Sequence, residues 1–528
     1  MINGINSYSN ANLINQYVSR INPPPQKPGT VTQVSENNSD TQTNTSILYV
    51  NDVHGKMTNM ERICAIAKTF DNTINPTSND KLKLASGDII LGANYTSNMV
   101  ANYFLNWIGV SANALGNHEL DVVPKNLAKL MDTANYKLLA INASVDPNSA
   151  MSGRIGKSII EEHNGKKYGI IGIAPSDMLE RVKLNDSLRE ISIDDFETTQ
   201  KKVQEEVDRL KNEEGVNKII VLSHSGFSND KKLAQNTSGI DVIIGGHTHK
   251  LITDVREGVN LFKSKTGEPV VITQGGKDGE NVGILNLVFN KDGVIEKVQN
   301  NVINTRQFNR NLTSRCAVEN IIGKPEILGT VNKAAPAPKE RLIENNPHGN
   351  IIVDAMRNEL NTDIAILNAG NIRGTFTEGK IDSRLISDIT PFEDKMLIVK
   401  LSEKQLVDSI KVGGKSMVNT GHKPGILLVS GLEYKMTKQG ELKELSFVDK
   451  NGNKTPIDIN NPSTEPKYTV ACDDFYATGG DNYLPTDPNP DFIIQKFDMD
   501  KNKLACNYIK KLPQPFEVNS DNRIQIVD

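Results

Sequence analysis

The sequence predicts an α/β fold for residues 46–310 and a smaller, mixed α+β unit for residues 341–528. In the first part, short apolar runs alternate with segments of helical periodicity, which is typical of layered α/β domains. Each apolar run also leads into a turn rich in glycine and polar side chains, where open α/β sheets place their ligands. The expected strands of this part are residues 47–50, 82–85, 112–115, 168–174, 218–222 and 242–244.

Helices are expected between these strands. Apolar side chains recur at helical spacing from Met60 to Phe70, which predicts an amphipathic helix. Further helices are expected over 96–109 and 192–210. Ser192 is the expected cap of the last one, because two aspartates follow it in what would be the first turn.

The second part is separated from the first by residues 311–340, which we expect to form a linker. Residues 327–341 within and beside it are rich in alanine, proline and lysine. Beyond the linker, a helix is expected over 350–360. The expected strands of this part are residues 364–367, 396–401, 425–434 and 468–471.

Residues 1–45 are expected to form a disordered polar tail, because they are rich in asparagine, serine, threonine and glutamine. Apolar residues at helical spacing leave a short helix near 11–21 possible. The tail lacks a basic segment followed by an apolar one, so we expect no secretory signal and a cytoplasmic location by default.

Bulk properties exclude several classes of protein. No run of 18 apolar residues occurs, so no membrane span is expected. The net charge of −4 argues against a nucleic-acid partner. The four cysteines, at 64, 316, 472 and 506, include no CxxC pair, which argues against a zinc–thiolate site and leaves open whether any of them form disulfides. The oligomeric state also stays open.

Five of the eight histidines lie in short polar motifs at predicted strand ends. Carboxylate, imidazole and amide oxygen are ligands that divalent transition metals accept without thiolate. The other three histidines, His163, His348 and His422, are expected in solvated loops. The motifs are Asp52-Val53-His54, Gly87-Asp88, Gly116-Asn117-His118-Glu119, His224 and Gly245-Gly246-His247-Thr248-His249.

The motifs supply ligands for two divalent ions, such as Zn²⁺, Mn²⁺ or Co²⁺. Side chains two apart on an extended strand point the same way, so Asp52 and His54 are expected to reach one ion. Asp88 follows a glycine and is expected to bridge both ions. One ion would take Asp52, His54, Asp88 and His249, and the other Asp88, Asn117, His224 and His247. Two such ions can hold a phosphate and activate a water, which predicts phosphoester hydrolysis.

The order of these motifs resembles that of the calcineurin-like metallophosphoesterases, and over residues 46–525 the chain resembles the bacterial 5′-nucleotidase and UDP-sugar hydrolase family. In the second part, Asn368–Arg373 (NAGNIR) resembles that family's NGGxIR element. Pro391-Phe392 resembles the start of its PFGN element, and Phe475–Asp481 resembles its FxxxGGD element. The resemblance implies a four-layer αββα metallophosphoesterase domain followed by a C-terminal 5′-nucleotidase domain that binds substrate.

The resemblance also implies roles for further residues. His118 and Asp121 match a histidine–aspartate dyad that stabilises the transition state rather than binding metal. Arg373 would contact the substrate phosphate, with help from Arg341. The remaining substrate-binding residues would be Asn368, the base-stacking pair Phe392 and Phe475, and Asp481 on the ribose hydroxyls.

The resemblance therefore predicts a dinuclear phosphohydrolase acting on nucleoside 5′-monophosphates. Two alternatives stay open within the enzyme class, a 2′,3′-cyclic nucleotide phosphodiesterase and a nucleotide-sugar hydrolase. A third is a nucleotide-binding sensor without activity. One departure bears on substrate choice, because Pro391-Phe392 is followed here by two acids, Glu393 and Asp394.

Overall fold

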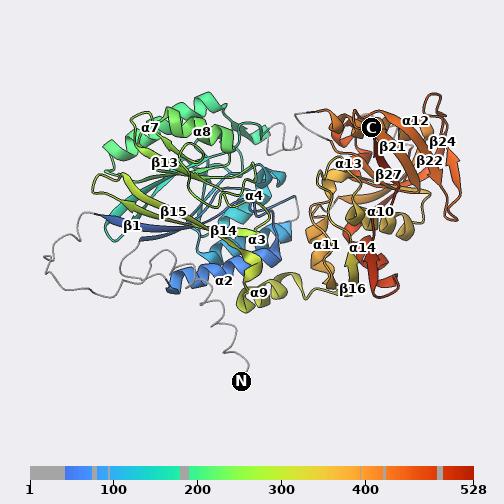
Figure 1. Ribbon diagram of the computed structural model, residues 1–528, viewed down its shortest axis with the longest axis horizontal. Coiled ribbons are helices and arrows are strands. Elements are labelled where there is room, and N and C mark those ends of the chain that lie inside the picture. The colour runs from blue at the N-terminus through green and yellow to red at the C-terminus, as the bar shows by residue number, and fades with distance from the viewer. Residues whose placement is uncertain are drawn as a thin grey trace, which may run out of the picture. The chain divides into compact units, whose positions relative to one another are not determined.

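The computed structural model describes residues 42–73, 80–92, 95–178, 189–392, 394–419, 424–484 and 492–528. The chain divides into two compact units, residues 1–323 and 324–528 (Figure 1). The predicted tail lies outside the described residues except for 42–45, as does the helix considered near 11–21. Order begins slightly earlier than expected, because Thr43 to Thr45 already pair with strand β14 (Asn281–Phe289).

The first large sheet of unit 1 has seven strands in the order β15-β14-β1-β2-β3-β4-β6. The run from β1 to β6 is parallel, and β14 and β15 are antiparallel at one edge. Its strands are β1 (Thr43–Val50), β2 (Asp80–Ala85), β3 (Ala112–Ala114), β4 (Lys137–Leu139), β6 (Ile155–Gly156), β14 (Asn281–Phe289) and β15 (Ile295–Asn304).

The second large sheet has six strands in the order β12-β13-β11-β10-β8-β7. Its four central strands are parallel, and the two edge strands are antiparallel. A separate pair joins β5 (Ala143–Val145) to β9 (Ile191–Ile193). The strands of the second sheet are β7 (Ser158–His163), β8 (Lys166–Ile173), β10 (Ile219–Ser223), β11 (Val242–Gly245), β12 (Leu261–Lys263) and β13 (Pro269–Thr273).

Alternating side chains divide the core of unit 1 into layers. Ile47 and Tyr49 of β1 pack between the two sheets. Leu48 and Val50 pack on the opposite face, against helices. Strand β10 alternates in the same way on the second sheet. The result is the predicted αββα arrangement, with α7 and α8 on one side and α2 and α3 on the other (Figure 1). The helices are α2 (Met57–Thr73), α3 (Tyr95–Ile108), α4 (Pro124–Asp132), α7 (Phe196–Asn212), α8 (Phe227–Asn236) and α9 (Leu312–Ile322).

Helix α7 begins later than predicted. Its cap is Asp195, whose carboxylate accepts a hydrogen bond of 2.7 Å from the backbone N–H of Thr198. Ser192, the expected cap, lies instead in β9 and pairs with Ser144 of β5. The first residues that helical periodicity assigned to this helix therefore form a strand instead.

The connection between the units is shorter than the predicted linker. Residues 311–340 include helix α9, which packs into the core of unit 1, and strand β16 (Ile327–Ala334) of unit 2. Asn311, which we assigned to the linker, caps α9 by accepting from the backbone N–H of Ser314 at 3.0 Å.

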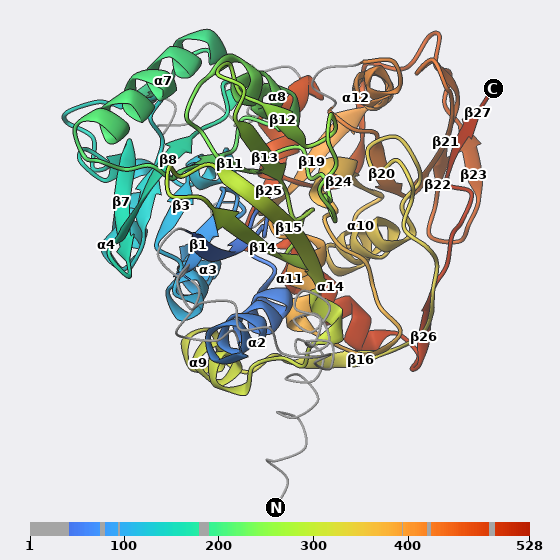
Figure 2. The same ribbon diagram turned by 60° about the vertical axis from the view of Figure 1, so that its left-hand side comes forward.

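The described residues of unit 2 form three sheets around one core. Their orders are β20-β17-β24-β19-β25, β18-β16-β26 and β23-β22-β21-β27, and Figure 2 shows the last of these along one edge of the unit. The strands are β17 (Ile364–Asn368), β18 (Gly379–Asp382), β19 (Lys395–Ser402), β20 (Leu427–Ser430), β21 (Leu432–Thr437), β22 (Leu442–Val448), β23 (Lys454–Pro456), β24 (Pro466–Asp473), β25 (Ile493–Asp500), β26 (Phe516–Val518) and β27 (Ile524–Val527). The helices are α10 (Pro347–Glu359), α11 (Ser383–Ile389), α12 (Glu403–Gly414), α13 (Asp474–Ala477) and α14 (Lys501–Lys511).

Two predictions in unit 2 are wrong. The single strand expected over 425–434 is two strands in different sheets, separated at Gly431, whose φ of +80° turns the chain. His348 does not lie in a solvated loop; it is buried in α10, where its Nδ1 accepts from the backbone N–H of Phe376 at 3.1 Å. His163 lies on the edge strand β7 and His422 falls outside the described residues.

All four cysteines are unpaired, and three of them are buried. Within the part of the chain that the structure describes, no helix combines the length and apolar character needed to cross a bilayer.

Candidate functional site

The candidate ligands of unit 1 stand in loops that follow five parallel strands, three from the first sheet and two from the second. The loops after β1 and β2 run side by side, because the backbone N–H of Asp52 donates to Gly87 O at 3.0 Å and that of His54 to Asp88 O at 2.9 Å. The loop after β2 is tied to the other sheet, since Ser86 Oγ donates to Gly245 O at 2.9 Å. Loops from both sheets thus meet at one place.

Most of these side chains are placed by left-handed backbone rather than by strand alternation. Five of the seven candidate ligands have positive φ, although only a few per cent of non-glycine residues adopt it. We expected Asp52 and His54 to point the same way because side chains alternate along a strand. That reason is wrong, because β1 ends at Val50, before either residue. Such backbone is strained and concentrates at functional sites. The angles are +48° for Asp52, +53° for His54, +53° for Asp88, +69° for His247 and +56° for His249.

The glycines of the motifs leave room for the imidazole of His224. A Cβ atom on Gly87 would collide with the His224 ring. One on Gly246 would lie 2.7 Å from His224 Nδ1, and one on Gly116 would collide with the carboxylate of Asp88. These positions therefore require glycine for close approach.

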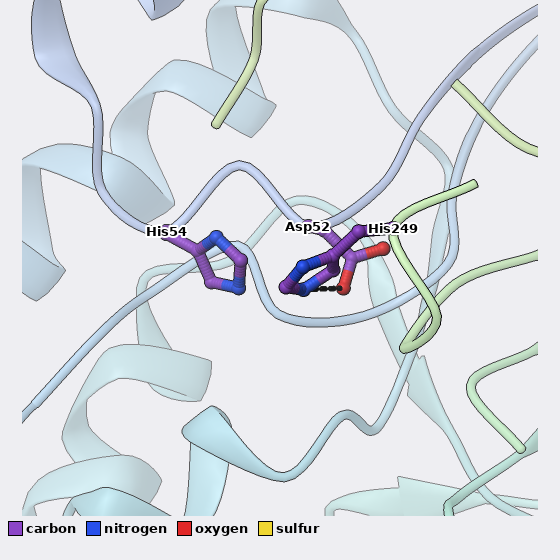
Figure 3. Close-up of side chains that lie close together, drawn as sticks. All are labelled: Asp52, His54 and His249. Carbon is purple, nitrogen blue, oxygen red and sulfur yellow. Dashed lines mark ion pairs between the residues drawn. The ribbon is translucent and has the colours of Figure 1, made fainter. Parts of the chain in front are cut away.

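A first group of donor atoms comprises Asp52, His54 and His249, all within 4.8 Å of one another. Figure 3 shows the three side chains pointing toward each other, with His249 Nε2 at 3.3 Å from Asp52 Oδ1. Asp52 and His54 are buried, whereas His249 is 38% exposed and so lies at the open side of the group.

A second group comprises Asp52, Asp88 and His224, again within 4.8 Å and all buried. His224 Nε2 lies 3.1 Å from Asp88 Oδ2 and 3.8 Å from Asp52 Oδ1. Asp52, which we assigned to one ion only, is therefore also within reach of the second set, and both carboxylates stand between the two sets of histidines.

Asn117 and His247 adjoin this second group. His247 Nδ1 lies 3.0 Å from Asn117 Oδ1, and the rings of His247 and His224 stand edge to face with centroids 5.2 Å apart. The backbone N–H of His247 also donates to both oxygens of Asp52 at 3.1 Å. All seven predicted ligands thus come together.

His118 stands beside the candidate ligands and is paired with Asp121. Its ring lies with His54 and Asp88 in a third group of donor atoms within 4.8 Å. Its Nδ1 is 2.7 Å from Asp121 Oδ2, as the predicted dyad requires, and Asp121 is held by the backbone N–H of Gly92 at 2.8 Å.

The donor set fits divalent cations. His54 Nε2 and His224 Nε2 are buried, and neither makes a hydrogen bond although each faces Asp88. Burial alone would lower the pKa of His224, but the charges of Asp88 and Asp52 outweigh it and raise that pKa to about 10. Burial likewise opposes protonation of His54, whose pKa the hydrogen bond with Asp278 and the charge of Asp88 raise to about 9. Divalent cations would balance the carboxylates instead and leave both imidazoles as neutral ligands.

Sequence reasoning missed the residues that hold the outer sides of these ligands. His54 Nδ1 lies 3.0 Å from Asp278 Oδ1, and His247 Nε2 lies 3.2 Å from Asp177 Oδ2. His224 Nδ1 donates to Ser86 O at 2.7 Å. Glu119 was named in a sequence motif but given no role; it accepts three backbone N–H groups around Asp88, and its burial raises its pKa to about 7. Such partners orient metal ligands.

In unit 2, several predicted substrate residues gather around the NAGNIR element. Asn368 ends β17, and its Oδ1 accepts from Asn371 Nδ2 at 2.5 Å. Arg341 Nη1 and Arg373 Nε both donate to the carbonyl of Gly370, at 3.1 and 2.8 Å. The Arg373 guanidinium lies 5.3 Å from the ring centre of Phe392. Two cations, an amide and an aromatic face therefore share one site.

Phe475 and Asp481 stand on neighbouring turns of unit 2. Phe475 lies in α13 and is partly buried against the core. Gly480 packs directly on its ring, where an added Cβ would lie 2.7 Å from two ring carbons. Asp481 has a φ of +52°. Glu393, which follows Phe392, lies outside the described residues.

Comparison with known families agrees with this geometry. Residues 45–251 match the calcineurin-like phosphoesterase family, and residues 327–486 match the 5′-nucleotidase C-terminal domain. Among curated proteins, the chain is 26% identical over 491 residues to the trifunctional nucleotide phosphoesterase protein YfkN of Bacillus subtilis. That alignment covers 83% of this chain but only 32% of the Bacillus protein.

Other relatives align over most of their length. A probable 5′-nucleotidase of Treponema pallidum is 24% identical over 77% of this chain and 79% of its own. Among solved structures, the 5′-nucleotidase precursor of Thermus thermophilus shares the fold with a TM-score of 0.69 at 23% identity, covering 92% of this chain and 99% of that one. The two family matches, the ligand cluster and the shared fold together place the chain among the calcineurin-like phosphoesterases with a 5′-nucleotidase C-terminal domain, a family of metal-dependent phosphoric monoester hydrolases.

Proposed function

We propose that the protein hydrolyses nucleoside 5′-monophosphates to nucleosides and phosphate at a centre of two divalent metal ions. One observation supports this above the others. Seven candidate ligands from five separate loops converge, and two of their buried imidazole nitrogens face a carboxylate without a hydrogen bond. Only a cationic partner uses all these donors at once.

The proposed ligand sets are those of the sequence analysis, with Asp88 shared. Asp52, His54, Asp88 and His249 would hold one ion, and Asp88, Asn117, His224 and His247 the other. When bound, the two ions would neutralise the phosphate oxygens and activate the attacking water. Zn²⁺, Mn²⁺ and Co²⁺ all suit these oxygen and nitrogen donors.

His118 is proposed to act on the reacting phosphate. Asp121 holds its Nδ1, so its Nε2 is the nitrogen free to donate toward charge that develops on the phosphate and the leaving oxygen. The bond from its backbone N–H to Asp88 Oδ1 at 2.9 Å supports a fixed ring position.

The second unit is proposed to recognise the nucleotide. Arg373, assisted by Arg341, would contact the phosphate, because guanidinium groups pair well with phosphate oxygens. Phe392 and Phe475 would stack on the base, since aromatic faces bind any base. Asn368 and Asp481 supply polar atoms for the nucleoside, with Asp481 assigned to the ribose hydroxyls.

A second candidate activity is hydrolysis of 2′,3′-cyclic nucleotides or nucleotide sugars. The name of the Bacillus relative, a trifunctional nucleotide phosphoesterase, supports testing more than one class of ester. The same donor set would serve a diester, because both reactions displace an oxygen from phosphorus between two ions.

A substrate panel tests the proposal. Purified protein loaded with Mn²⁺ would be assayed for phosphate release from AMP, UMP, 2′,3′-cyclic AMP, UDP-glucose and bis-p-nitrophenyl phosphate, with a phosphatase added where a diester product must be counted. We expect the highest kcat/KM with a nucleoside 5′-monophosphate. The Asp88→Asn variant is the control for contaminating phosphatase. Binding of nucleotides without turnover of any substrate would identify an inactive sensor and reject the proposal.

A further inference from the structure

Lys501 is a fully buried cation in unit 2. It is the first residue of α14, and its side chain has no exposed surface. A cation is unfavourable at a helix N-terminus, and a buried ammonium group needs charged or polar partners. Its position therefore requires a reason beyond packing.

The partners of Lys501 belong to two separate segments. Its Nζ donates to the carbonyl of Phe392 at 2.8 Å and lies 3.3 Å from Asp394 Oδ2, both just before β19. It also lies 3.8 Å from Asp473 Oδ2, at the end of β24. One ammonium group thus joins the segment that carries Phe392 to the strand that leads into α13.

Asp473 extends this network to Phe475. Its Oδ1 accepts from the backbone N–H of Tyr476 at 2.9 Å and so caps α13, the short helix on which Phe475 stands. Asp473 is 1% exposed, so its carboxylate depends on these protein partners. The cap and the ion pair use the two oxygens of one carboxylate.

The same carboxylate reaches the NAGNIR element. Asn371 Nδ2 donates to Asp473 Oδ2 at 3.3 Å and to Asn368 Oδ1 at 2.5 Å. All these partners are buried or half-buried. The network therefore contacts each of the three sequence elements that the proposed function assigns to the nucleotide.

We propose that Lys501 and Asp473 form a positioning hub that fixes Phe392, Phe475 and the Asn368 amide relative to one another for nucleotide binding. The inference rests on the proposed function. It also accounts for the acid at position 394, whose carboxylate pairs with Lys501 and holds the Phe392 segment. The hub touches none of the candidate metal ligands, so it acts on substrate affinity and not on the hydrolytic step.

The test is steady-state kinetics of full-length, metal-loaded Lys501→Met, which keeps side-chain length and removes the charge. Displacement of binding groups by about 1 Å can lower catalytic efficiency by as much as 10²-fold. We expect KM for AMP to rise about 10- to 100-fold on that scale, with kcat changed less than threefold. Hydrolysis of bis-p-nitrophenyl phosphate should stay within twofold of the unsubstituted protein. Lys511→Met is the matched control, because Lys511 lies on the same helix in an exposed ion pair with Glu359 at 2.7 Å.

The outcomes separate the inference from the proposed function. An unchanged KM for AMP in folded Lys501→Met overturns the hub, as does an equal loss on both substrates. If Lys501→Met does not fold, the milder Asp394→Asn decides, with an expected rise in KM for AMP and an unchanged diester rate. An unchanged KM in that variant overturns the hub. If the unsubstituted protein releases no phosphate from AMP, the proposed function fails and the hub fails with it.

Discussion

His54 is held from both sides of its ring. Its Nδ1 lies 3.0 Å from Asp278 Oδ1, while its Nε2 faces Asp88 Oδ2 at 3.6 Å. Asp278 is itself fixed, because its backbone N–H donates to Asp52 O at 2.6 Å and its carbonyl accepts from Asn59 Nδ2 at 2.9 Å. A carboxylate beside Nδ1 keeps that nitrogen protonated. The lone pair of Nε2 is then available to bind a metal ion.

Replacing Asp278 should therefore weaken metal binding. Asp278→Asn is the suitable change, because asparagine tolerates the φ of +56° at this position and keeps the side-chain shape. We expect a loss of about 10- to 100-fold in affinity for Mn²⁺ or Zn²⁺, the usual effect of removing an outer partner of a metal ligand. Isothermal titration calorimetry measures it, with the exposed Asp254→Asn as control. Unchanged affinity in Asp278→Asn would show that Asp88 alone orients His54.

His118 should act on the reaction and not on the metal. Its Nδ1 is engaged by Asp121 at 2.7 Å, so removing the ring should leave the ion count intact. We expect His118→Asn to retain two ions per chain and to lose roughly 10²- to 10⁴-fold in kcat, the range for a positioned proton or charge donor. Metal analysis and kcat on AMP together decide. Loss of one ion with recovery of activity at high metal concentration would make His118 a ligand.

Among single residues, the sequence predicts those that stand in short motifs and not the partners that are distant in the chain. Six of the seven candidate ligands were singled out because they stand in short motifs, and His224 because it follows a predicted strand. Asp278 and Asp177 were missed because they meet His54 and His247 across 224 and 70 positions of the chain. The one local signal for Asp278 was its place between Lys277 and Gly279 after two further glycines, which marks a tight turn beside the site.

Strand β11 leads into the GGHTH motif, and a buried acid just before the strand ties it to the neighbouring strand β10. Asp241 directly precedes the strand and is 7% exposed; its Oδ2 accepts from the backbone N–H of Ile219 in β10 at 2.7 Å. Burial raises the pKa of Asp241 from 3.8 to about 8. The folded protein therefore binds this proton more tightly than the unfolded chain does.

The raised pKa of Asp241 makes the stability of the folded protein depend on pH. Between pH 3.8 and about 8 the unfolded chain ionises Asp241 while the folded protein keeps it neutral, so this group makes stability fall as pH rises. Asp241→Asn keeps the acceptor and removes the titration. We expect it to raise Tm at pH 8.5 by roughly 2–4 °C, equivalent to about 1 kcal/mol, and to have little effect near pH 4. Differential scanning calorimetry at both pH values, with the exposed Asp132→Asn as control, checks this. A gain that is equal at both pH values would contradict it.

Helices and strands were predicted well where one sequence pattern was clear. They were predicted poorly where the same residues fit two kinds of local structure. Six parallel strands of unit 1, β1, β2, β3, β8, β10 and β11, were found from their apolar runs, whereas β4, β6 and β13 were not predicted. The start of α7 was misplaced because Ile191–Ile193 can satisfy a helical period or pair with β5. His348 was misplaced because Asn346-Pro347 is typical of a turn and also of a capped helix start, and the structure has the second.

In the whole molecule, the two units are proposed to have different tasks. Unit 1 carries every candidate metal ligand, and unit 2 carries every candidate contact to the nucleoside. Changes in unit 2 should therefore distinguish substrates with a base from substrates without one.

The aromatic pair offers that comparison. Removing Phe392 or Phe475 should cost about 1–3 kcal/mol of binding, the usual worth of base–aromatic stacking. That corresponds to roughly 5- to 150-fold in kcat/KM for AMP, with a much smaller change for bis-p-nitrophenyl phosphate. The matched control is Phe447→Ala, which removes a ring packed on Tyr468 at 4.8 Å in the same unit. Equal losses on both substrates, with lowered Tm, would make the two phenylalanines core residues.

The two-part architecture was predictable because both the change in composition and the order of motifs mark it. Its boundary was not, since the alanine-, proline- and lysine-rich segment that favoured a linker includes β16, whose pairing partners β18 and β26 lie far along the chain. The same holds for the Lys501 network, in which Lys501 meets Phe392 across 109 positions and Asp473 meets Asn371 across 102.

Hydrolysis is proposed to depend on two ions held by the candidate ligands of unit 1. The most direct measurement titrates EDTA-stripped protein with Mn²⁺ while following phosphate release from AMP and metal bound per chain. We expect no hydrolysis without metal, activity that reaches its plateau as the second ion binds, and fewer than two ions bound by Asp88→Asn. Full activity in metal-free protein, or a plateau at one ion per chain, would contradict it.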